Sequence, residues 1–187
     1  MTSIVESMVG EYLRYQALAE AALAQLSDAE LATPSPGNGN SIATICWHVS
    51  GNLQSRFTDF LASDGEKPWR QREEEFAART VTKADLLAHW AKGWSVLLGT
   101  LATLDDSMLS RTVTIRKQPL SVDQALMRSL AHVSYHVGQV VFAARALRGA
   151  EWRFLSIPPG QTDAYNAKAG AETPAAHVAR VRDAVRG

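Results

Sequence analysis

Four segments of the 187-residue chain place apolar residues three and four positions apart, over stretches of about 20 to 28 residues. This spacing puts the apolar side chains on one face of an α-helix. Helices of this length bury such faces by packing against one another, so the pattern predicts an all-α fold built as a four-helix bundle. The segments run over residues 3–26, 41–61, 82–104 and 121–148.

Local signals mark the ends of these segments and the connections between them. Thr82 with Asp85, and Ser121 with Gln124, have the spacing of helix-capping boxes, and Gly149 follows the fourth segment as a typical helix end. Three connections lack helical periodicity: the Pro- and Gly-rich stretch 33–40, the charged stretch 66–79, and residues 112–119, whose alternation predicts a short strand or hairpin. A last short helix is expected to begin at Thr173-Pro174.

Composition narrows the class of protein. With 46% hydrophobic and 20% charged residues the chain is typical of a globular protein, which excludes wholesale disorder. Its 19 basic and 19 acidic residues cancel, so no overall positive field favours nucleic acid. A single cysteine excludes an internal disulfide, and no apolar run reaches a membrane span of about 20 residues. We expect one domain over 1–170, a C-terminal tail over 171–187, and, because the first residues resemble no targeting peptide, a cytoplasmic location.

Two histidines stand one helical turn apart in the fourth segment. His132 and His136 lie on the same shoulder of its apolar face, with the small residues Ala125, Ser129 and Ala143. This spacing lets two ring nitrogens converge on one divalent ion. The alternative is that they are two polar residues at the edge of a core face.

The second segment offers a third histidine. His48 lies on a shoulder of the apolar stripe with Asn52 one turn beyond it. Three histidines with an open position form a common catalytic zinc site. Cys46 faces the core instead and is interpreted as a small apolar residue. His89 has no second ligand one turn away, and His177 lies in the tail, which we interpret as peripheral, so both are weaker candidates.

Arg56 falls inside the apolar arc of the second segment, between Leu53 and Phe57. A buried guanidinium needs a partner. One interpretation is a structural ion pair, for example with the acidic run 73–75. The other is contact with an anionic ligand, because a guanidinium binds carboxylates through two parallel hydrogen bonds.

Several stretches resemble a known family. The segment HVSYHVGQ at 132–139, together with His48, resembles the last-helix signature and third histidine of the DinB-like superfamily. The stretches 41–76 and 155–166 are similar to a branch of that superfamily catalogued as a domain of unknown function, which includes uncharacterised Bacillus proteins. The resemblance covers residues 1–167, nearly the whole chain.

The resemblance implies an up-up-down-down bundle with a long crossover between the second and third helices. It also implies a divalent metal ion, nickel or zinc, held by His48, His132 and His136, and a homodimer. Characterised relatives are metal-dependent transferases of low-molecular-weight thiols such as bacillithiol and mycothiol, including a mycothiol-dependent maleylpyruvate isomerase. Many other members have no known reaction.

Three functions remain open from the residues and the resemblance together. In the first, the metal activates a small thiol, Arg56 contacts an anionic substrate or thiol, and Asn52 or Gln139 orients a ligand or a bound water. A metal-dependent hydrolase is less favoured, because no glutamate is placed on the helix shoulders as a general base. The third is a metal-binding stress or interaction protein without turnover. None of the three needs nucleic acid or a membrane as a partner.

Overall fold

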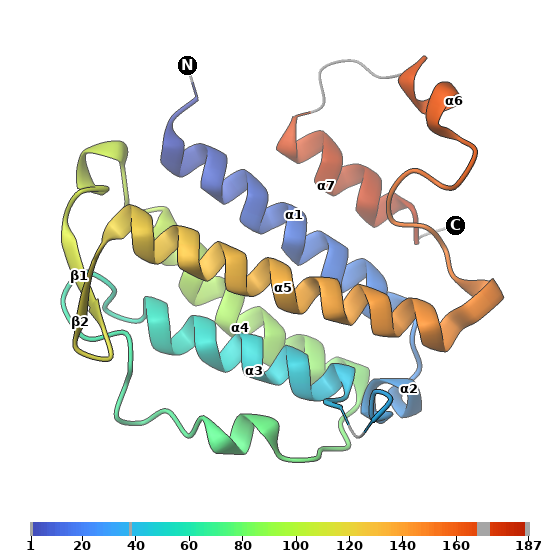
Figure 1. Cartoon of the computed structure of the whole chain (residues 1–187), viewed down its shortest axis with the longest axis horizontal. Helices are drawn as coiled ribbons and strands as arrows, with labels where there is room; N and C mark the ends of the chain where they lie inside the picture. Colours follow the sequence, from blue (N-terminus) through green and yellow to red (C-terminus); the bar gives the residue numbers. More distant parts are fainter. Residues whose placement is uncertain (1, 38, 168–172, 186–187) are drawn as a thin grey trace.

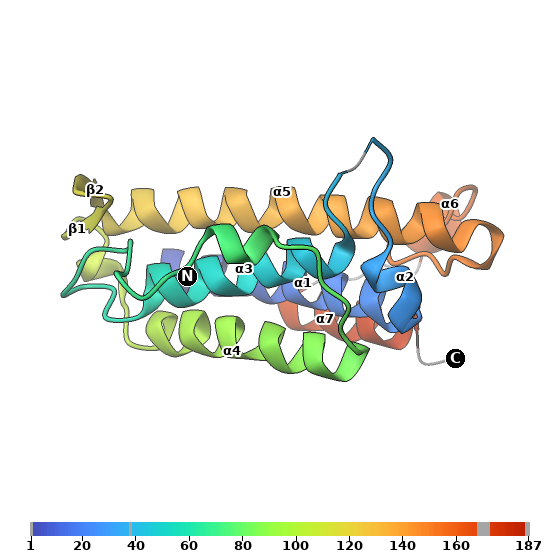
Figure 2. The same ribbon diagram turned by 90° about the horizontal axis from the view of Figure 1, so that it is seen from below.

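A computed structural model describes residues 2–37, 39–167 and 173–185, and these residues are mostly helical with one small two-stranded sheet. The longest four helices each lie inside one of the predicted segments, and Figure 1 and Figure 2 show them side by side. They are α1 (Ile4–Ala24), α3 (Ile42–Phe57), α4 (Lys83–Leu101) and α5 (Val122–Arg148). The predicted helical pattern is therefore confirmed.

The helices run up, down, down, up, so the expected up-up-down-down order is wrong. Helices α3 and α4 are parallel, since Thr100 at the end of α4 donates to the Phe57 carbonyl at the end of α3. Helices α1 and α5 run the other way, and Arg148 at the end of α5 pairs with Glu30 just beyond α1. Within the described residues one connection crosses the length of the bundle, namely residues 58–82 between α3 and α4, where the crossover was expected. An up-up-down-down bundle needs two such connections.

Capping side chains fix where the helices begin. Ser3 and Glu6 form a capping box, as do Ser121 and Gln124, and the Thr82 hydroxyl accepts from the Asp85 N–H. The ends follow local geometry: α5 stops at Gly149, whose φ is +53°, as the sequence predicts. Helix α3 stops at Phe57, four residues before the expected end at Leu61.

Shorter elements join the long helices. The hairpin predicted near residues 112–119 is present, and its strands pair in antiparallel register around Arg116 and Lys117, which both have positive φ. Its strands are β1 (Thr112–Ile115) and β2 (Gln118–Ser121). The remaining helical elements are α2 (Asp28–Ala32), η1 (Glu73–Phe76), η2 (Asp106–Met108), η3 (Gly149–Glu151), α6 (Thr162–Asn166) and α7 (Pro174–Asp183). The sequence pattern missed α2, whose five residues are too few to show a periodicity.

The core lies between the four long helices. All the side chains expected there are buried, namely Cys46, Val49, Leu53, Trp90, Trp94, Leu126, Val133 and Val137. Helices α3 and α4 pack closely, because a Cβ at Gly93 would come within 2.7 Å of Ser50 Cα. Along the described residues we find no helix with the length and apolar character needed to span a membrane.

The C-terminal helix α7 begins at Thr173-Pro174 as predicted and packs against α1. Its His177 and Val181 are buried, so the interpretation of this segment as peripheral is wrong. Arg14 from α1 donates to His177 Nε2 at 3.1 Å, which gives this histidine a structural partner. The proposed boundary at residue 170 lies outside the described residues.

Candidate metal centre

Three histidines from two helices converge between α3 and α5. His48 comes from α3, and His132 and His136 come from consecutive turns of α5. The His132 Nε2 atom lies 3.3 Å from Nε2 of His48 and 3.1 Å from Nε2 of His136. One nitrogen from each ring lies within 4.8 Å of the other two.

The opposite ring nitrogens of two histidines are held in place. His48 Nδ1 lies 2.8 Å from the Glu75 carboxylate, and His136 Nδ1 lies 2.8 Å from Oε1 of Gln139. Both acceptors receive a hydrogen bond from Nδ1–H, so in the neutral form of these two rings each Nε2 presents a lone pair to the centre. Since His132 Nε2 carries at most one proton, at most one of the two short nitrogen contacts is a hydrogen bond.

This arrangement fits a divalent cation. Three imidazole nitrogens facing one point are the donor set that zinc, nickel, copper and iron accept. Burial, and then the neighbouring His136 and His48, lower the pKa of His132 to about 3, and burial also lowers the pKa of His136. These two rings are therefore neutral at physiological pH, as metal coordination requires. His132 Nδ1 is buried without a hydrogen-bond partner among the described residues.

Glu75 is the residue of the centre that the sequence interpretation missed. It lies in η1 of the crossover, and its side chain is 8% exposed, whereas that of Glu73 in the same run is 88% exposed. Arg70 donates to both Glu75 oxygens at 2.8 Å. Burial raises the pKa of Glu75, but the hydrogen bonds from Arg70 and His48 outweigh it and hold this pKa below its ordinary value. Glu75 is thus an anchored carboxylate behind His48.

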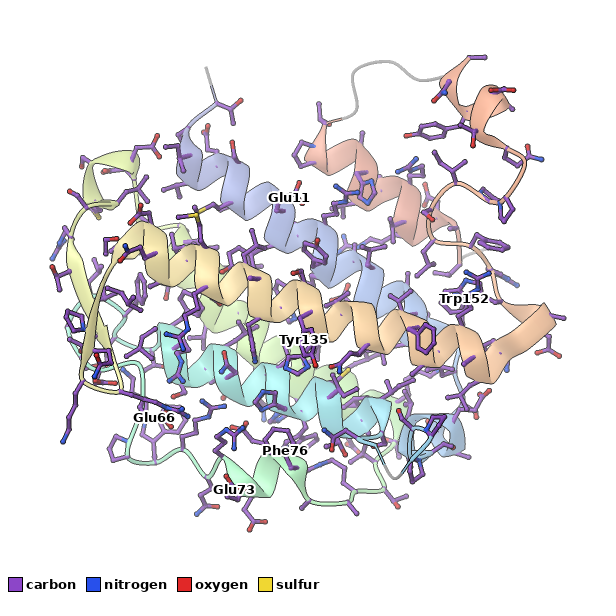
Figure 3. All side chains as sticks on the ribbon, in the orientation of Figure 1. Glu11, Glu66, Glu73, Phe76, Tyr135 and Trp152 are labelled. Carbon is purple, nitrogen blue, oxygen red and sulfur yellow. The ribbon has the colours of Figure 1, made fainter. Side chains whose placement is uncertain are left out.

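A glycine makes room for this carboxylate. A Cβ at Gly51 would lie 2.4 Å from Glu75 Oε1, so only glycine lets the crossover come this close to α3. The ring of Phe76 also packs against that of His48, with centroids 4.6 Å apart, and Tyr135 packs against His136 at 5.0 Å. Figure 3 shows Phe76 on the crossover and Tyr135 on α5.

The other candidates take different positions. Asn52 lines a cavity next to the centre, and no hydrogen bond joins it to a histidine among the described residues. Arg56 donates to the Gly65 carbonyl at 2.5 Å and to Glu66 at 3.0 Å. The structural ion pair is therefore present, but with Glu66 rather than the acidic run 73–75. His89 lies outside the triad, stacked on Trp47 with ring centroids 3.7 Å apart. Cys46 is fully buried, which raises the pKa of its thiol to about 12 and leaves it unreactive.

The cavity beside the centre has a volume of about 280 Å³ and reaches two of the three histidines, His48 and His132. Phe57, Phe60 and Ile115 form an apolar wall. The polar remainder of the lining is Asn52, Arg56, Arg70, Arg72, Arg116, Gln118, Arg128 and Ser129. The centre is thus open to a small molecule on one side.

The fold and the three histidines define a mostly helical protein with a candidate metal centre. Residues 1–161 match a family described as a protein of unknown function, DUF1572, and the chain belongs to that family. No curated protein matches the chain. The crystal structure of a conserved protein from Enterococcus faecalis is similar, with a TM-score of 0.58 and 21% identity over 80% of this chain and 99% of that one. At this identity the similarity concerns the fold alone.

Proposed function

We propose that the protein is a divalent-metal-binding enzyme of the DinB-like superfamily, with His48, His132 and His136 as the metal ligands. The observation that carries the proposal is the convergence of three Nε2 atoms, with the rings of His48 and His136 oriented by hydrogen bonds at Nδ1. Without a cation, lone pairs would face one another in a buried site, which costs free energy. Nickel or zinc suits this donor set.

Glu75 and Gln139 orient the ligand rings. By accepting from Nδ1, Glu75 fixes the tautomer of His48 and Gln139 that of His136. A divalent ion supplies positive charge, which lowers the pKa of a thiol or water bound to it. The cavity supplies the space in which a small-molecule substrate approaches the same centre.

Among possible reactions, we propose transfer of a low-molecular-weight thiol. A metal-dependent hydrolase is less favoured, because Glu75, the carboxylate hydrogen-bonded to the triad, is already bound by Arg70 and His48 and is not free to act as a general base. A thiol activated by the metal needs no such base. The open cavity supports an enzyme over a metal site of purely structural or interaction function, because structural zinc sites are closed by four protein ligands.

We further propose that the enzyme is a cytoplasmic homodimer. Met127, Tyr135 and Phe142 support the dimer: they lie on α5 at spacings of eight and seven residues and are 51%, 63% and 77% exposed. Large apolar side chains exposed on one helix face are typical of a protein–protein contact.

Elemental analysis of the purified protein tests the metal site. We expect about one divalent ion per chain in the wild type, and its loss in His136→Ala. Because the ion stabilises the folded state by mass action, chelation should lower the melting temperature of the wild type but not of His136→Ala. His89→Ala is the matched control and should keep its metal. An unchanged metal content in His136→Ala would contradict the proposal. Thiol transfer is then tested on metal-loaded protein with bacillithiol, mycothiol and a chromogenic electrophile.

A further inference from the structure

Five arginines from four separate segments line the cavity beside the triad. They are Arg56 of α3, Arg70 and Arg72 of the crossover, Arg116 of the hairpin turn and Arg128 of α5. No aspartate or glutamate is among the described lining residues. Like charges gathered around a cavity repel one another, and the repulsion grows where water is excluded. Such an arrangement therefore needs negative charge nearby.

The protein supplies only part of that charge. Glu66 pairs with Arg56 and Arg116, and Glu75 pairs with Arg70. Glu73 pairs with Arg72, but its side chain is 88% exposed, so this pair is screened by water. In the described part of the chain the five guanidinium groups exceed the carboxylates that make ion pairs with them, Glu66, Glu73 and Glu75, by two charges. A bound divalent ion would add to this excess.

The arginines differ in how free they are to bind a ligand. The side chains of Arg56 and Arg70 are 12% and 2% exposed and are held by internal partners. Arg116 has a 59% exposed side chain with one ion pair. Arg128 is exposed and makes none of the ion pairs or hydrogen bonds found within the described part of the chain. Arg116 and Arg128 therefore have donors available at the cavity, from two different elements, the hairpin turn and α5.

We propose that this cavity binds a small organic dianion, a dicarboxylate or a phosphate ester, whose charged groups contact Arg116 and Arg128. Guanidinium groups bind both kinds of anion through paired hydrogen bonds. The apolar wall of Phe57, Phe60 and Ile115 accommodates the carbon skeleton. One part of this inference, that the dianion is the substrate of a metal centre, rests on the proposed function. The binding of the dianion to the arginines can be measured without metal.

Calorimetry on the full chain tests the inference, with each titration repeated on chelator-treated and zinc-loaded protein at low salt. Succinate is compared with butyrate, and glycerol phosphate with glycerol, so that the two pairs distinguish carboxylate from phosphate recognition. We expect at least one dianion to bind about tenfold or more tightly than its comparison compound, and to weaken as salt is raised. Arg128→Gln and Arg116→Gln should each weaken binding about tenfold.

Arg111→Gln is the matched control, because it removes the same charge from an exposed arginine outside the cavity lining. Equal losses in Arg111→Gln and Arg128→Gln would overturn the inference, as would dianions that bind no more tightly than butyrate and glycerol. Metal content measured on the same samples separates the two proposals. Dianion binding to a protein that takes up no metal would refute the metal centre alone, and zinc uptake without dianion binding would refute this inference alone.

Discussion

The crossover between α3 and α4 carries two carboxylates that each accept several hydrogen bonds, but from different kinds of donor. Near its start, Asp64 accepts from the backbone N–H groups of Glu66, Arg116 and Lys117 at 2.7 to 2.8 Å. Further along, Glu75 accepts from the side chains of His48 and Arg70. Asp64 ties the crossover to the hairpin turn, whereas Glu75 ties it to the candidate metal centre.

The difference indicates what each carboxylate is for. Backbone donors stay in place when neighbouring side chains change, so the bonds to Asp64 hold the fold. Side-chain donors have functions of their own, and Glu75 orients one of the proposed metal ligands. Figure 3 shows Glu66 near the hairpin, and Glu73 pointing away from the bundle in the same short helix as Glu75. Substitutions at the two carboxylates should therefore separate loss of fold stability from loss of the site.

The largest effect is expected for Glu75→Gln. The change keeps the shape of the side chain but removes the nearer charged partner of the buried Arg70 and leaves it, within the described residues, only Glu66 at 4.0 Å, which costs up to about 3–5 kcal/mol in the free energy of unfolding. Weaker orientation of His48 should also lower metal affinity by about 10- to 100-fold. Denaturant titration and metal titration measure the two effects. Glu73→Gln, in the same run but exposed, should change neither, and equal metal affinities in the two variants would remove Glu75 from the site.

The fold was largely predictable from the sequence because its signals are local. Helical periodicity and capping residues such as Ser121 and Gln124 act within one or two turns, and the structure confirms them. The direction of the helices was not predictable in the same way. It depends on which connection crosses the bundle, and contacts between residues far apart in the sequence determine this. One of them is the hydrogen bond from the backbone N–H of Lys83, at the start of α4, to Asp28 beyond α1, 55 positions away.

The site was predictable only in part. His132 and His136 share one helix, so their spacing alone indicates a pair of converging rings, and the structure brings His48 to them. Glu75 and Arg70 lie in a charged stretch that resembles an ordinary solvated surface. The short helix η1 turns Glu75 inward, and no periodicity of the sequence shows this. The sequence signal that could have pointed to Glu75 is Gly51, a glycine within the same helix as His48. A glycine at such a position indicates that another segment approaches the helix closely.

A smaller effect is expected for Gly51→Ala. Alanine normally favours a helix over glycine by about 1 kcal/mol. Here the new methyl group would meet the Glu75 carboxylate, so we expect a destabilisation of about 1–3 kcal/mol and a metal affinity between those of the wild type and Glu75→Gln. Gly99→Ala in α4 is the control, since nothing lies within 4 Å of its Cβ position, and it should be neutral or stabilising. A stabilised Gly51→Ala variant with normal metal affinity would contradict the close approach.

The smallest effect is expected for Asp64→Asn, and it should depend on pH. Hydrogen bonds from the backbone of Glu66, followed by that of Lys117, lower the pKa of Asp64 from 3.8 to about 2. A carboxylate whose pKa is lowered by folding stabilises the protein above its unfolded pKa, and this contribution is lost as the pH falls through the folded value. Because Asp64 is only partly buried, solvent screening should limit the loss in Asp64→Asn to about 1 kcal/mol at neutral pH.

The difference in unfolding free energy between wild type and Asp64→Asn should therefore be constant from neutral pH down to about 5 and should shrink as the pH falls from about 4 towards 2. Denaturant titrations of both proteins across this range measure it, and other acidic groups cancel because they are common to the two chains. Metal content should be unchanged, because Asp64 contacts the hairpin and not the histidines. A difference that grows on acidification, or a loss of metal, would mean that the two ends of the crossover are energetically coupled and that the division between fold and site is wrong.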